Sequence, residues 1–390
     1  MNFSIDLTPL TWGLLAGAAV LSVVYVWWQW HRSRVLTRHV REEELQRPYA
    51  EELPPVSVIV DAGNETDQLM DFLPLVLHQD YPTMEVIVVA DGSAESTSDL
   101  LSELKASFAN LHITFTPHDM RSLSRKKLAL MIGLKAAHYD VVLTTSANCR
   151  AASDQWLRTM MRNFVDGVDV VLGYSHYRYK RDRQWWHRYR VYDTVCTAVQ
   201  WLTTAIQGHP YRGTSDNLAY RKHLFFDHHG FARCMELQWG EDDVWLSPLM
   251  TADNTRVELA PESQLSTYYD NMARTHSLLK MRRDFTSRFV RQSQFVVASC
   301  MSLAYYLRLA ALIAAVALNP TNAVVLIAAA LILIGTWIGT IGSMRRNCTL
   351  LQAPRLLFTV PFFTVWRPVV NLVYRLGERA RTKSNYTTYA

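Results

Sequence analysis

The sequence predicts an α/β protein whose mostly parallel sheet is sandwiched by helices, with transmembrane and interfacial helices attached. Two observations carry this prediction. Short apolar, β-branched runs alternate four times with stretches of helical periodicity between residues 54 and 145, a pattern typical of parallel sheets with right-handed crossovers. Outside that region, three apolar stretches are each long enough to cross a hydrocarbon layer of about 30 Å.

Four strand candidates are rich in apolar or β-branched residues; the runs at 56–60, 86–90 and 141–144 predict buried strands, the first of them buried on both faces. These four strands are expected at residues 56–60, 86–90, 112–115 and 141–144. Helical spacing of apolar residues predicts the connecting helices at residues 69–77, 96–108 and 126–137. A further helix at 154–164 and a strand at 168–174 extend the pattern. Residues 177–190 mix basic and aromatic side chains, which fits a membrane interface and a solvated helix equally well.

The three apolar stretches cover residues 10–30, 296–318 and 323–343. Basic residues, beginning with Arg32 and Arg34, follow the first stretch and none precedes it. The positive-inside rule therefore places the N-terminus outside and the following domain in the cytoplasm, and we expect an integral protein of the cell (inner) membrane. Buried core helices are the alternative, chiefly for 296–318, where Arg308 interrupts the apolar run.

The last part of the chain differs from these spans. Apolar residues at 350–376 are interrupted by three prolines and three arginines, which a straight spanning helix tolerates poorly. We expect an interfacial or re-entrant segment. From Met344 to the end, eight Lys/Arg accompany one acid, Glu378, so this segment suits an anionic lipid surface.

These features predict six regions. They are an N-terminal transmembrane helix (1–30), a linker or short helix (31–53), a cytoplasmic α/β domain (54–275), a basic connecting helix (276–295), two transmembrane helices (296–343) and a basic interfacial or re-entrant segment (344–390).

Composition excludes some classes of function. The net charge is only +5, from 40 basic and 35 acidic residues. The basic residues cluster beside apolar segments rather than along a groove, which argues against nucleic-acid binding. The five cysteines show neither paired spacing nor a zinc pattern.

The strand at 141–144 ends in the short polar turn Thr145-Ser146-Ala147-Asn148. Ligands of open α/β sheets bind beyond the carboxyl ends of the strands. We therefore expect this turn at the centre of a site.

Three carboxylates, Glu241, Asp242 and Asp243, follow Gly240 and open an apolar stretch expected to be helical. An acid at a helix N-terminus is favoured by the helix dipole, so capping is one explanation. One acid suffices for capping, and three in succession near a cleft favour a chemical role.

Taken together in order, these segments resemble family 2 inverting glycosyltransferases of the GT-A fold that are anchored in a membrane. The resemblance covers residues 55–265, and its motifs are the first strand with Asn64 and Glu65, the segment 79–93, Lys126-Lys127, the loop 213–221 and the Glu241-Asp242 pair. It implies that Asn64 and Glu65 lie near the donor, that Asp91 contacts the nucleotide base, and that 213–221 lies on the acceptor side. The signature of processive synthases is not evident near Arg282-Arg283, which favours transfer of a single sugar.

The chain departs from the family pattern on the donor side. The family's metal motif is a pair of aspartates separated by one residue, and Ser146 and Asn148 stand at these positions. Neutral oxygen ligands hold a divalent cation less strongly than carboxylates. Three outcomes stay open: a weakly bound Mg²⁺ or Mn²⁺, replacement of the metal by Lys127 or Arg125, or loss of catalysis.

A carboxylate can act as general base on an acceptor hydroxyl, and Asp242 is the candidate, with Glu241 and Asp243 as runners-up. The expected donor-binding residues are Asn64, Glu65, Asp91, Lys127, Ser146 and Asn148, and the expected acceptor-binding residues are Trp239 and Asp243. No protein-held metal ligand is expected. Turn formation by Asp91, helix capping by Asn64 and Glu65, and core packing of Trp239 are the structural alternatives.

The expected function is membrane-associated transfer of one sugar from a nucleotide-sugar donor to a lipid-linked or envelope-glycan acceptor on the cytoplasmic face. The expected partners are the donor, this acceptor, membrane lipids and proteins of a glycan-synthesis complex. The alternative is a catalytically silent scaffold or binding subunit of such a complex.

Overall fold

The computed structural model describes residues 7–46, 48–63, 66–91, 95–117, 124–179, 185–269, 272–290 and 293–379. The chain divides into two compact units, which we describe separately. The membrane unit comprises 1–38, 184–200 and 292–373, and the sheet unit comprises 39–183, 201–291 and 374–390.

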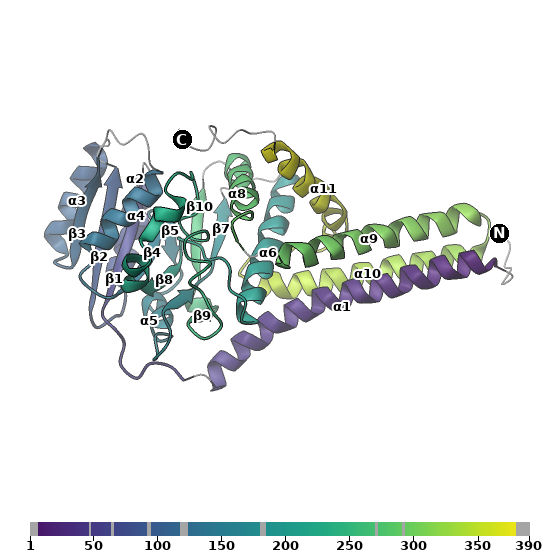
Figure 1. Ribbon diagram of the computed structural model, residues 1–390, viewed down its shortest axis with the longest axis horizontal. Coiled ribbons are helices and arrows are strands. Elements are labelled where there is room, and N and C mark those ends of the chain that lie inside the picture. Colours follow the sequence, from purple (N-terminus) through teal and green to yellow (C-terminus); the bar gives the residue numbers. More distant parts are fainter. Residues whose placement is uncertain are drawn as a thin grey trace. The chain divides into compact units, whose positions relative to one another are not determined.

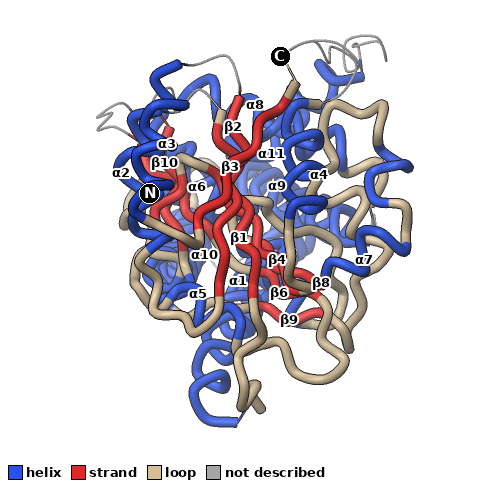
Figure 2. Tube along the Cα trace, turned by 90° about the vertical axis from the view of Figure 1, so that its left-hand side faces the viewer, coloured by secondary structure: helices blue, strands red, loops and turns tan. Residues whose placement is uncertain are grey.

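The sheet unit is built on a seven-stranded sheet of order β3-β2-β1-β4-β8-β6-β9 (Figures 1 and 2). β1 pairs in parallel with β2 and β4, and β2 with β3, whereas β8 is antiparallel to both β4 and β6. The strands are β1 (Val56–Ala62), β2 (Met84–Asp91), β3 (Leu111–Thr116), β4 (Val141–Ser146), β6 (Val170–Leu172), β8 (Leu218–Arg221) and β9 (Thr255–Val257). The predicted mostly parallel sheet is confirmed.

Helices cover both faces of this sheet because alternate residues of the buried strands point in opposite directions. Val58 and Val60 of β1 belong to one core cluster with side chains of α2, α3 and α5. Ile59 points to the other face, where it lies so close to Gly133 of α4 that a Cβ atom there would be 2.5 Å from it. The helices are α2 (Thr66–Leu77), α3 (Glu95–Ser107), α4 (Arg125–Ala136), α5 (Trp156–Met161), α7 (Lys222–Asp227) and α8 (Met272–Thr286), with 3₁₀ turns η1 (Gly230–Cys234) and η2 (Pro261–Ser263).

A second sheet of three strands continues from the end of β4. Its order is β5 (Cys149–Ala151), β10 (Leu265–Tyr269) and β7 (Ser175–Tyr179). The amide of Tyr268 donates to the carbonyl of Asn148 at 2.9 Å. This pairing brings β10 beside the turn that follows β4.

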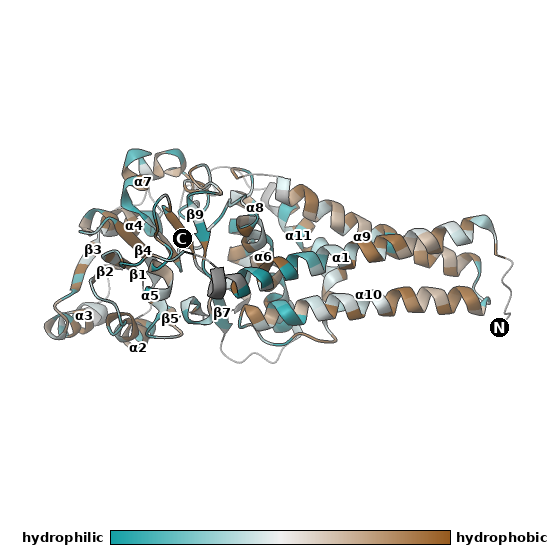
Figure 3. Cartoon of the chain, turned by 90° about the horizontal axis from the view of Figure 1, so that it is seen from below, coloured by the Kyte–Doolittle hydropathy of each residue, from teal (hydrophilic) through white to brown (hydrophobic). Residues whose placement is uncertain are grey.

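The membrane unit contains helices long and apolar enough to cross a bilayer, at 9–41, 295–318 and 323–350. They belong to α1 (Pro9–Gln46), α9 (Ser293–Leu318) and α10 (Ala323–Leu350), whose apolar stretches are brown in Figure 3. Trp30 of α1 donates its indole N–H to the carbonyl of Gly339 at 2.8 Å, and Asn319 after α9 donates to Thr11 Oγ1 at 2.9 Å. Polar contacts at both ends thus hold α1 against its neighbours. The guanidinium of Arg308, inside α9, is fully buried and lies over the ring of Tyr305.

The unit is completed by parts of α6 (Trp185–Ile206) and α11 (Val360–Arg379). α11 is one continuous helix that contains Pro368, and it is not among the helices with the composition of a span. The assignment of 344–390 as interfacial or re-entrant stays a prediction.

Two elements differ from expectation. α1 continues through the predicted linker as far as Gln46. The residues from Glu241 onward form turns rather than the expected helix. Gly240 has φ +118°, a conformation that side-chain-bearing residues rarely adopt, and it directly precedes the carboxylates. The run therefore does not cap a helix.

Candidate active site

The site begins at the carboxyl ends of two neighbouring parallel strands. Asp61 near the end of β1 is the register partner of Ser146, the last residue of β4. Asp61 is 9% exposed and pairs with Arg125 at 3.3 Å. Arg125 also donates to the carbonyl of Ala62 at 2.8 Å. The turn after β4 therefore lies at the end of the central sheet, as expected.

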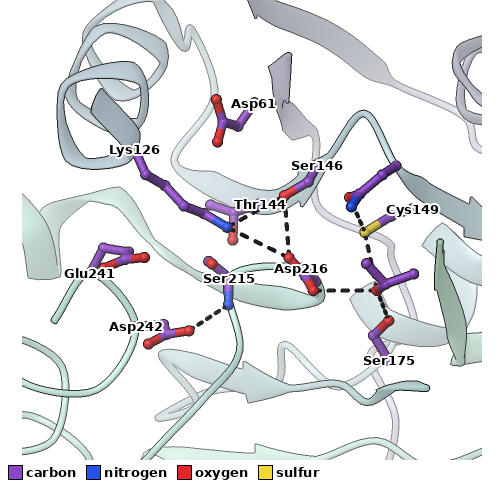
Figure 4. Close-up of polar contacts among 12 residues, drawn as sticks. Asp61, Lys126, Thr144, Ser146, Cys149, Ser175, Ser215, Asp216, Glu241 and Asp242 are labelled. Carbon is purple, nitrogen blue, oxygen red and sulfur yellow. Dashed lines mark hydrogen bonds and ion pairs between the residues drawn. The ribbon is translucent and has the colours of Figure 1, made fainter. Parts of the chain in front are cut away.

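A lysine and a carboxylate converge on Ser146 (Figure 4). The ammonium of Lys126, from the first turn of α4, lies 3.5 Å from Ser146 Oγ and 3.6 Å from Asp216 Oδ1. The Ser146 hydroxyl donates to Asp216 Oδ1 at 3.2 Å. A partly buried cation, whose side chain is 25% exposed, thus lies at the position where the resemblance leads one to expect a metal ion.

Asp216 is held by the second sheet. Thr267 Oγ1 of β10 donates to Asp216 Oδ2 at 3.3 Å and lies against Ser175 Oγ and, at 3.4 Å, Cys149 Sγ. Asp216 is only 6% exposed. These contacts fix the carboxylate that holds Lys126.

Asn148 is engaged by backbone rather than free in a cleft. Its side-chain amide donates to the carbonyl of Tyr268 at 3.1 Å, and the residue is 7% exposed. Because the amide nitrogen is bound to β10, the remaining polar atom is the side-chain oxygen, which lies 3.7 Å from Cys149 Sγ.

Arg282 forms ion pairs with two residues of the carboxylate run, Glu241 and Asp242. Arg282 Nη2 of α8 lies 3.0 Å from Glu241 Oε1 and 2.5 Å from Asp242 Oδ1. The other oxygen of Asp242 accepts from the amide of Ser215 at 3.1 Å, the residue before Asp216 (Figure 4). The 213–216 loop therefore links the carboxylate run to the Lys126–Ser146–Asp216 cluster.

The surrounding charges and burial shift the pKa values of Asp242 and Asp243 in opposite directions. Burial alone would raise the pKa of Asp242, but Arg282, Arg212 and Lys126 outweigh burial and hold that pKa below its ordinary value. Burial and the neighbouring Asp242 raise the pKa of Asp243. Asp242 is thus the more readily ionised of the two carboxyl groups, and a general base must be ionised at neutral pH.

The pKa values of Lys126 and Lys127 are also shifted in opposite directions. Burial disfavours the charged form of Lys126, yet Asp216 and Asp61 raise its pKa above the ordinary value. The pKa of Lys127 is lowered by burial, and its ammonium is held by the carbonyls of Cys234 and Leu237. Lys126, not Lys127, faces Ser146.

The other predicted site residues are placed as follows. Asn64 and Glu65 lie outside the described residues. The backbone of Asp91 ends β2, in register with Thr116, and its side chain lies outside the described part. Trp239 is half-buried and packs edge-to-face on Phe285 at 5.8 Å.

Sequence reasoning missed three participants: Lys126, Asp216 and Arg282. All three fall in segments that the sequence analysis singled out, at Lys126-Lys127, the 213–221 loop and Arg282-Arg283. The available signal was a charged residue inside each segment. Nothing in the sequence showed that these segments face one another.

Within the described residues, the side chains best arranged to hold a metal lie elsewhere. Glu85, His112 and His138 offer ligand atoms within 4.8 Å of one another. Glu85 is near the start of β2 and His112 near the start of β3. This cluster therefore lies at the amino ends of the parallel strands, whereas Ser146 lies at the carboxyl end of β4. It does not supply the ligands that Ser146 and Asn148 lack.

Comparisons with known proteins place this site in context. Residues 57–237 match the model of the family described as Glycosyl transferase family 2. Poly-beta-1,6-N-acetyl-D-glucosamine synthase of Staphylococcus aureus (strain MSSA476) is 31% identical over 114 residues, which are 29% of this chain and 26% of that protein. The enzyme of the same name from Staphylococcus epidermidis is 31% identical over 93 residues, 24% of this chain and 21% of that protein. The chain thus matches about a quarter of the length of these relatives.

Among solved structures, the mannosyltransferase PcManGT from Pyrobaculum calidifontis, in complex with GDP-Man and Mn²⁺, superposes with a TM-score of 0.54. The match covers 91% of this chain and 99% of that one at 18% identity. At this identity the similarity concerns the fold alone, and it agrees with the predicted GT-A class.

Proposed function

Because the chain carries a family 2 glycosyl transferase domain at 57–237, we propose that it transfers one sugar from a nucleotide-sugar donor to an acceptor hydroxyl in the membrane. The observation that carries the proposal is the pairing of a buried anionic base with a partly buried cation across one loop. Asp242 and Lys126 both contact the segment that contains Ser215 and Asp216. Such a pair suits a reaction in which a hydroxyl loses its proton while a diphosphate departs.

In the proposed reaction, the acceptor oxygen forms a bond to the anomeric carbon as the bond to the diphosphate breaks. Asp242 takes the hydroxyl proton, and the leaving diphosphate carries away the bonding electron pair. Lys126 neutralises the charge that develops on the diphosphate, the part usually played by a divalent cation. Arg282 keeps Asp242 ionised and must shift from Asp242 Oδ1, or share it, when the hydroxyl binds.

Glu241 is the second candidate for the base. It is 3% exposed, and its Oε2 has no hydrogen-bond partner among the described groups. We keep Asp243 and Trp239 as acceptor-side residues, and Asn64, Glu65, Asp91, Lys127, Ser146 and Asn148 on the donor side. For Lys127 this requires release from its carbonyl partners.

The donor, the acceptor and the membrane side are part of the proposal. A lipid-linked or envelope-glycan acceptor on the cytoplasmic face fits the three apolar helices and the distribution of basic residues beside them. The relatives that share this domain are named as synthases of a poly-N-acetylglucosamine, which supports an envelope glycan. A weakly bound Mg²⁺ or Mn²⁺ between the diphosphate and Asn148 is compatible with this scheme.

The test is release of nucleoside diphosphate by the purified full-length protein, with a panel of nucleotide sugars and a membrane lipid extract as acceptor, in EDTA and in MnCl₂. We expect turnover in EDTA. Turnover that requires manganese would contradict the role of Lys126, and an unchanged rate in Asp242→Asn would contradict the base.

A silent scaffold is the second candidate, favoured by the replacement of the aspartate pair with Ser146 and Asn148 and by the ion pair that occupies Asp242. Absence of turnover together with absence of nucleotide-sugar binding by calorimetry would support it. Micromolar binding of any nucleotide sugar counts against it.

A further inference from the structure

The membrane unit contains a polar cavity that the proposed transfer reaction does not use. The cavity has a volume of 50 Å³ and is lined from five helices, α1, α6, α9, α10 and α11. This volume accommodates a few water molecules, or one tetrahedral phosphate group. A cavity of this kind among membrane helices calls for a polar occupant, because unsolvated polar groups are costly there.

The lining is positively charged. Two arginines, Arg32 of α1 and Arg367 of α11, contribute to it, and its described lining residues include no carboxylate. Arg367 is oriented from behind, since its Nε donates to Asp193 Oδ1 at 2.8 Å and its Nη2 to Thr197 Oγ1 at 3.4 Å. Asp193 itself is not part of the lining.

The remaining lining suits an oxygen-rich group. Gln29 and Gln200 bring side-chain amides, which can donate hydrogen bonds to an anion. Ser302 also lines the cavity, but its hydroxyl donates to the carbonyl of Ala298 at 2.8 Å and is not counted as a ligand. Paired guanidinium forks with neutral donors are the usual means of binding a phosphate group.

The surroundings indicate where the phosphate comes from. Two helices of the cavity wall carry large aromatic side chains on their outer surfaces: Trp185 and Trp186 of α6 are 51% and 48% exposed, and Phe362 and Trp366 of α11 are 61% and 47% exposed. Trp186 and Trp366 lie near each other, with ring centroids 6.5 Å apart. Tryptophan belts of this kind mark the headgroup level of a bilayer. The cavity shares its wall helices α6 and α11 with this aromatic surface, which favours a lipid headgroup as the source of the phosphate.

We propose that this cavity binds the phosphate group of a membrane lipid, with Arg32 and Arg367 as its principal ligands. The inference goes beyond the glycosyl transfer proposed above and does not depend on it. Binding can be measured without any nucleotide sugar, so failure of one proposal leaves the other standing.

The first experiment uses the full-length protein in a neutral detergent and native mass spectrometry. The protein is titrated with phosphatidic acid, with diacylglycerol of the same chains, and with inorganic phosphate. We expect phosphatidic acid to bind at least about tenfold more tightly than diacylglycerol, and inorganic phosphate to compete only weakly. Equal binding of the two lipids would overturn the site. Inorganic phosphate that competes as strongly as the lipid would leave a phosphate site and overturn the lipid assignment.

The second experiment compares matched arginine variants. Arg32→Gln and Arg367→Gln should each weaken phosphatidic acid binding about tenfold, because each removes a charged hydrogen-bonding partner. Arg345→Gln is the control, since Arg345 is exposed on α10 two residues from the cavity residue Asn347 and does not line the cavity. Its affinity should stay within about twofold of wild type.

Arg367→Gln leaves Asp193 without its cation, so loss of folding in that variant is foreseeable. Arg32→Gln is then decisive, with monodisperse elution in size-exclusion chromatography as the folding check. Wild-type affinity in folded Arg32→Gln, or an equal loss in Arg345→Gln, would contradict the proposal.

Discussion

Replacing Lys126 with glutamine tests the site most sharply. Glutamine is polar and one atom shorter than lysine, and the substitution removes the charge that lies 3.5 Å from Ser146 Oγ and 3.6 Å from Asp216 Oδ1. If a lysine does the work of a metal ion, this charge stabilises the departing diphosphate. The variant should then bind acceptor normally and lose rate in the transfer step.

The magnitude follows from the geometry. At the 3.6 Å that separates Lys126 Nζ from Asp216 Oδ1, two unit charges attract by about 4.6 kcal/mol at an effective dielectric constant of about 20. A phosphate oxygen at a similar distance would gain a comparable amount. Water that enters the variant site recovers part of it, so we expect a loss of about 3 kcal/mol, or about 100-fold in kcat/KM.

The assay is release of nucleoside diphosphate in EDTA, and Lys135→Gln is the control because Lys135 is exposed on the same helix. The control should keep wild-type activity. A Lys126→Gln enzyme that retains more than half of the wild-type kcat/KM would refute the reasoning. A loss of the same size in Lys135→Gln would show that helix α4, not the charge of Lys126, is responsible.

Four further predictions follow from named contacts. Asp242→Asn should lower kcat at least about 100-fold by removing the base, whereas Asp253→Asn, at an exposed position, should not; equal rates in both variants would move the base to Glu241. Arg282→Gln removes the charge that most strongly opposes the effect of burial on the pKa of Asp242, so that pKa should rise and the acid limb of the kcat/KM–pH profile should move to higher pH, while Arg274→Gln, exposed on the same helix, leaves it in place. In the wild type the depressed pKa stabilises the fold above the ordinary aspartate pKa of about 3.9, and this stabilisation is lost as pH falls through the folded-state value; a thermal-denaturation series from pH 7 to 3 checks the sign. Asn217→Ala should destabilise the sheet unit by about 3 kcal/mol, since the buried amide bonds Trp156 Nε1 and the carbonyls of Tyr174 and Ser263; an unchanged melting temperature would contradict this.

The central strands and their helices could be predicted because their signals are local. The runs at 56–60 and 141–144 consist mostly of Val, Ile and Leu, and each lies within a strand of the structure. Helical periodicity likewise located α4 to within one residue of each predicted end. In these elements burial pattern and chain propensity agree.

The stretch after Gly240 was predicted wrongly because its pattern was ambiguous. Acids followed by apolar residues are typical of a helix start, but the backbone at Gly240 turns with φ +118°. Trp245 is instead anchored by its indole N–H, which donates to the carbonyl of Glu241 at 2.6 Å. This local contact, with a residue four positions earlier in the chain, cannot be deduced from the spacing of the apolar residues.

The partners within the site were beyond sequence reasoning for a different reason. Lys126 and Lys127 are adjacent, so they point about 100° apart on a helix of 3.6 residues per turn, and the sequence does not say which faces β4. Asp216 reaches Ser146 only because β8 runs antiparallel beside β4, with Leu218 opposite Thr144. Ser146 and Asp216 are 70 residues apart in the chain, so no local sequence pattern indicates their contact.

The most direct test of a lysine in place of a metal ion is calorimetric titration of the wild-type protein with uridine and guanosine diphosphates in EDTA. The account predicts micromolar binding of at least one of them without metal, and less than about a twofold change when manganese replaces EDTA. Binding that appears only with manganese would contradict it.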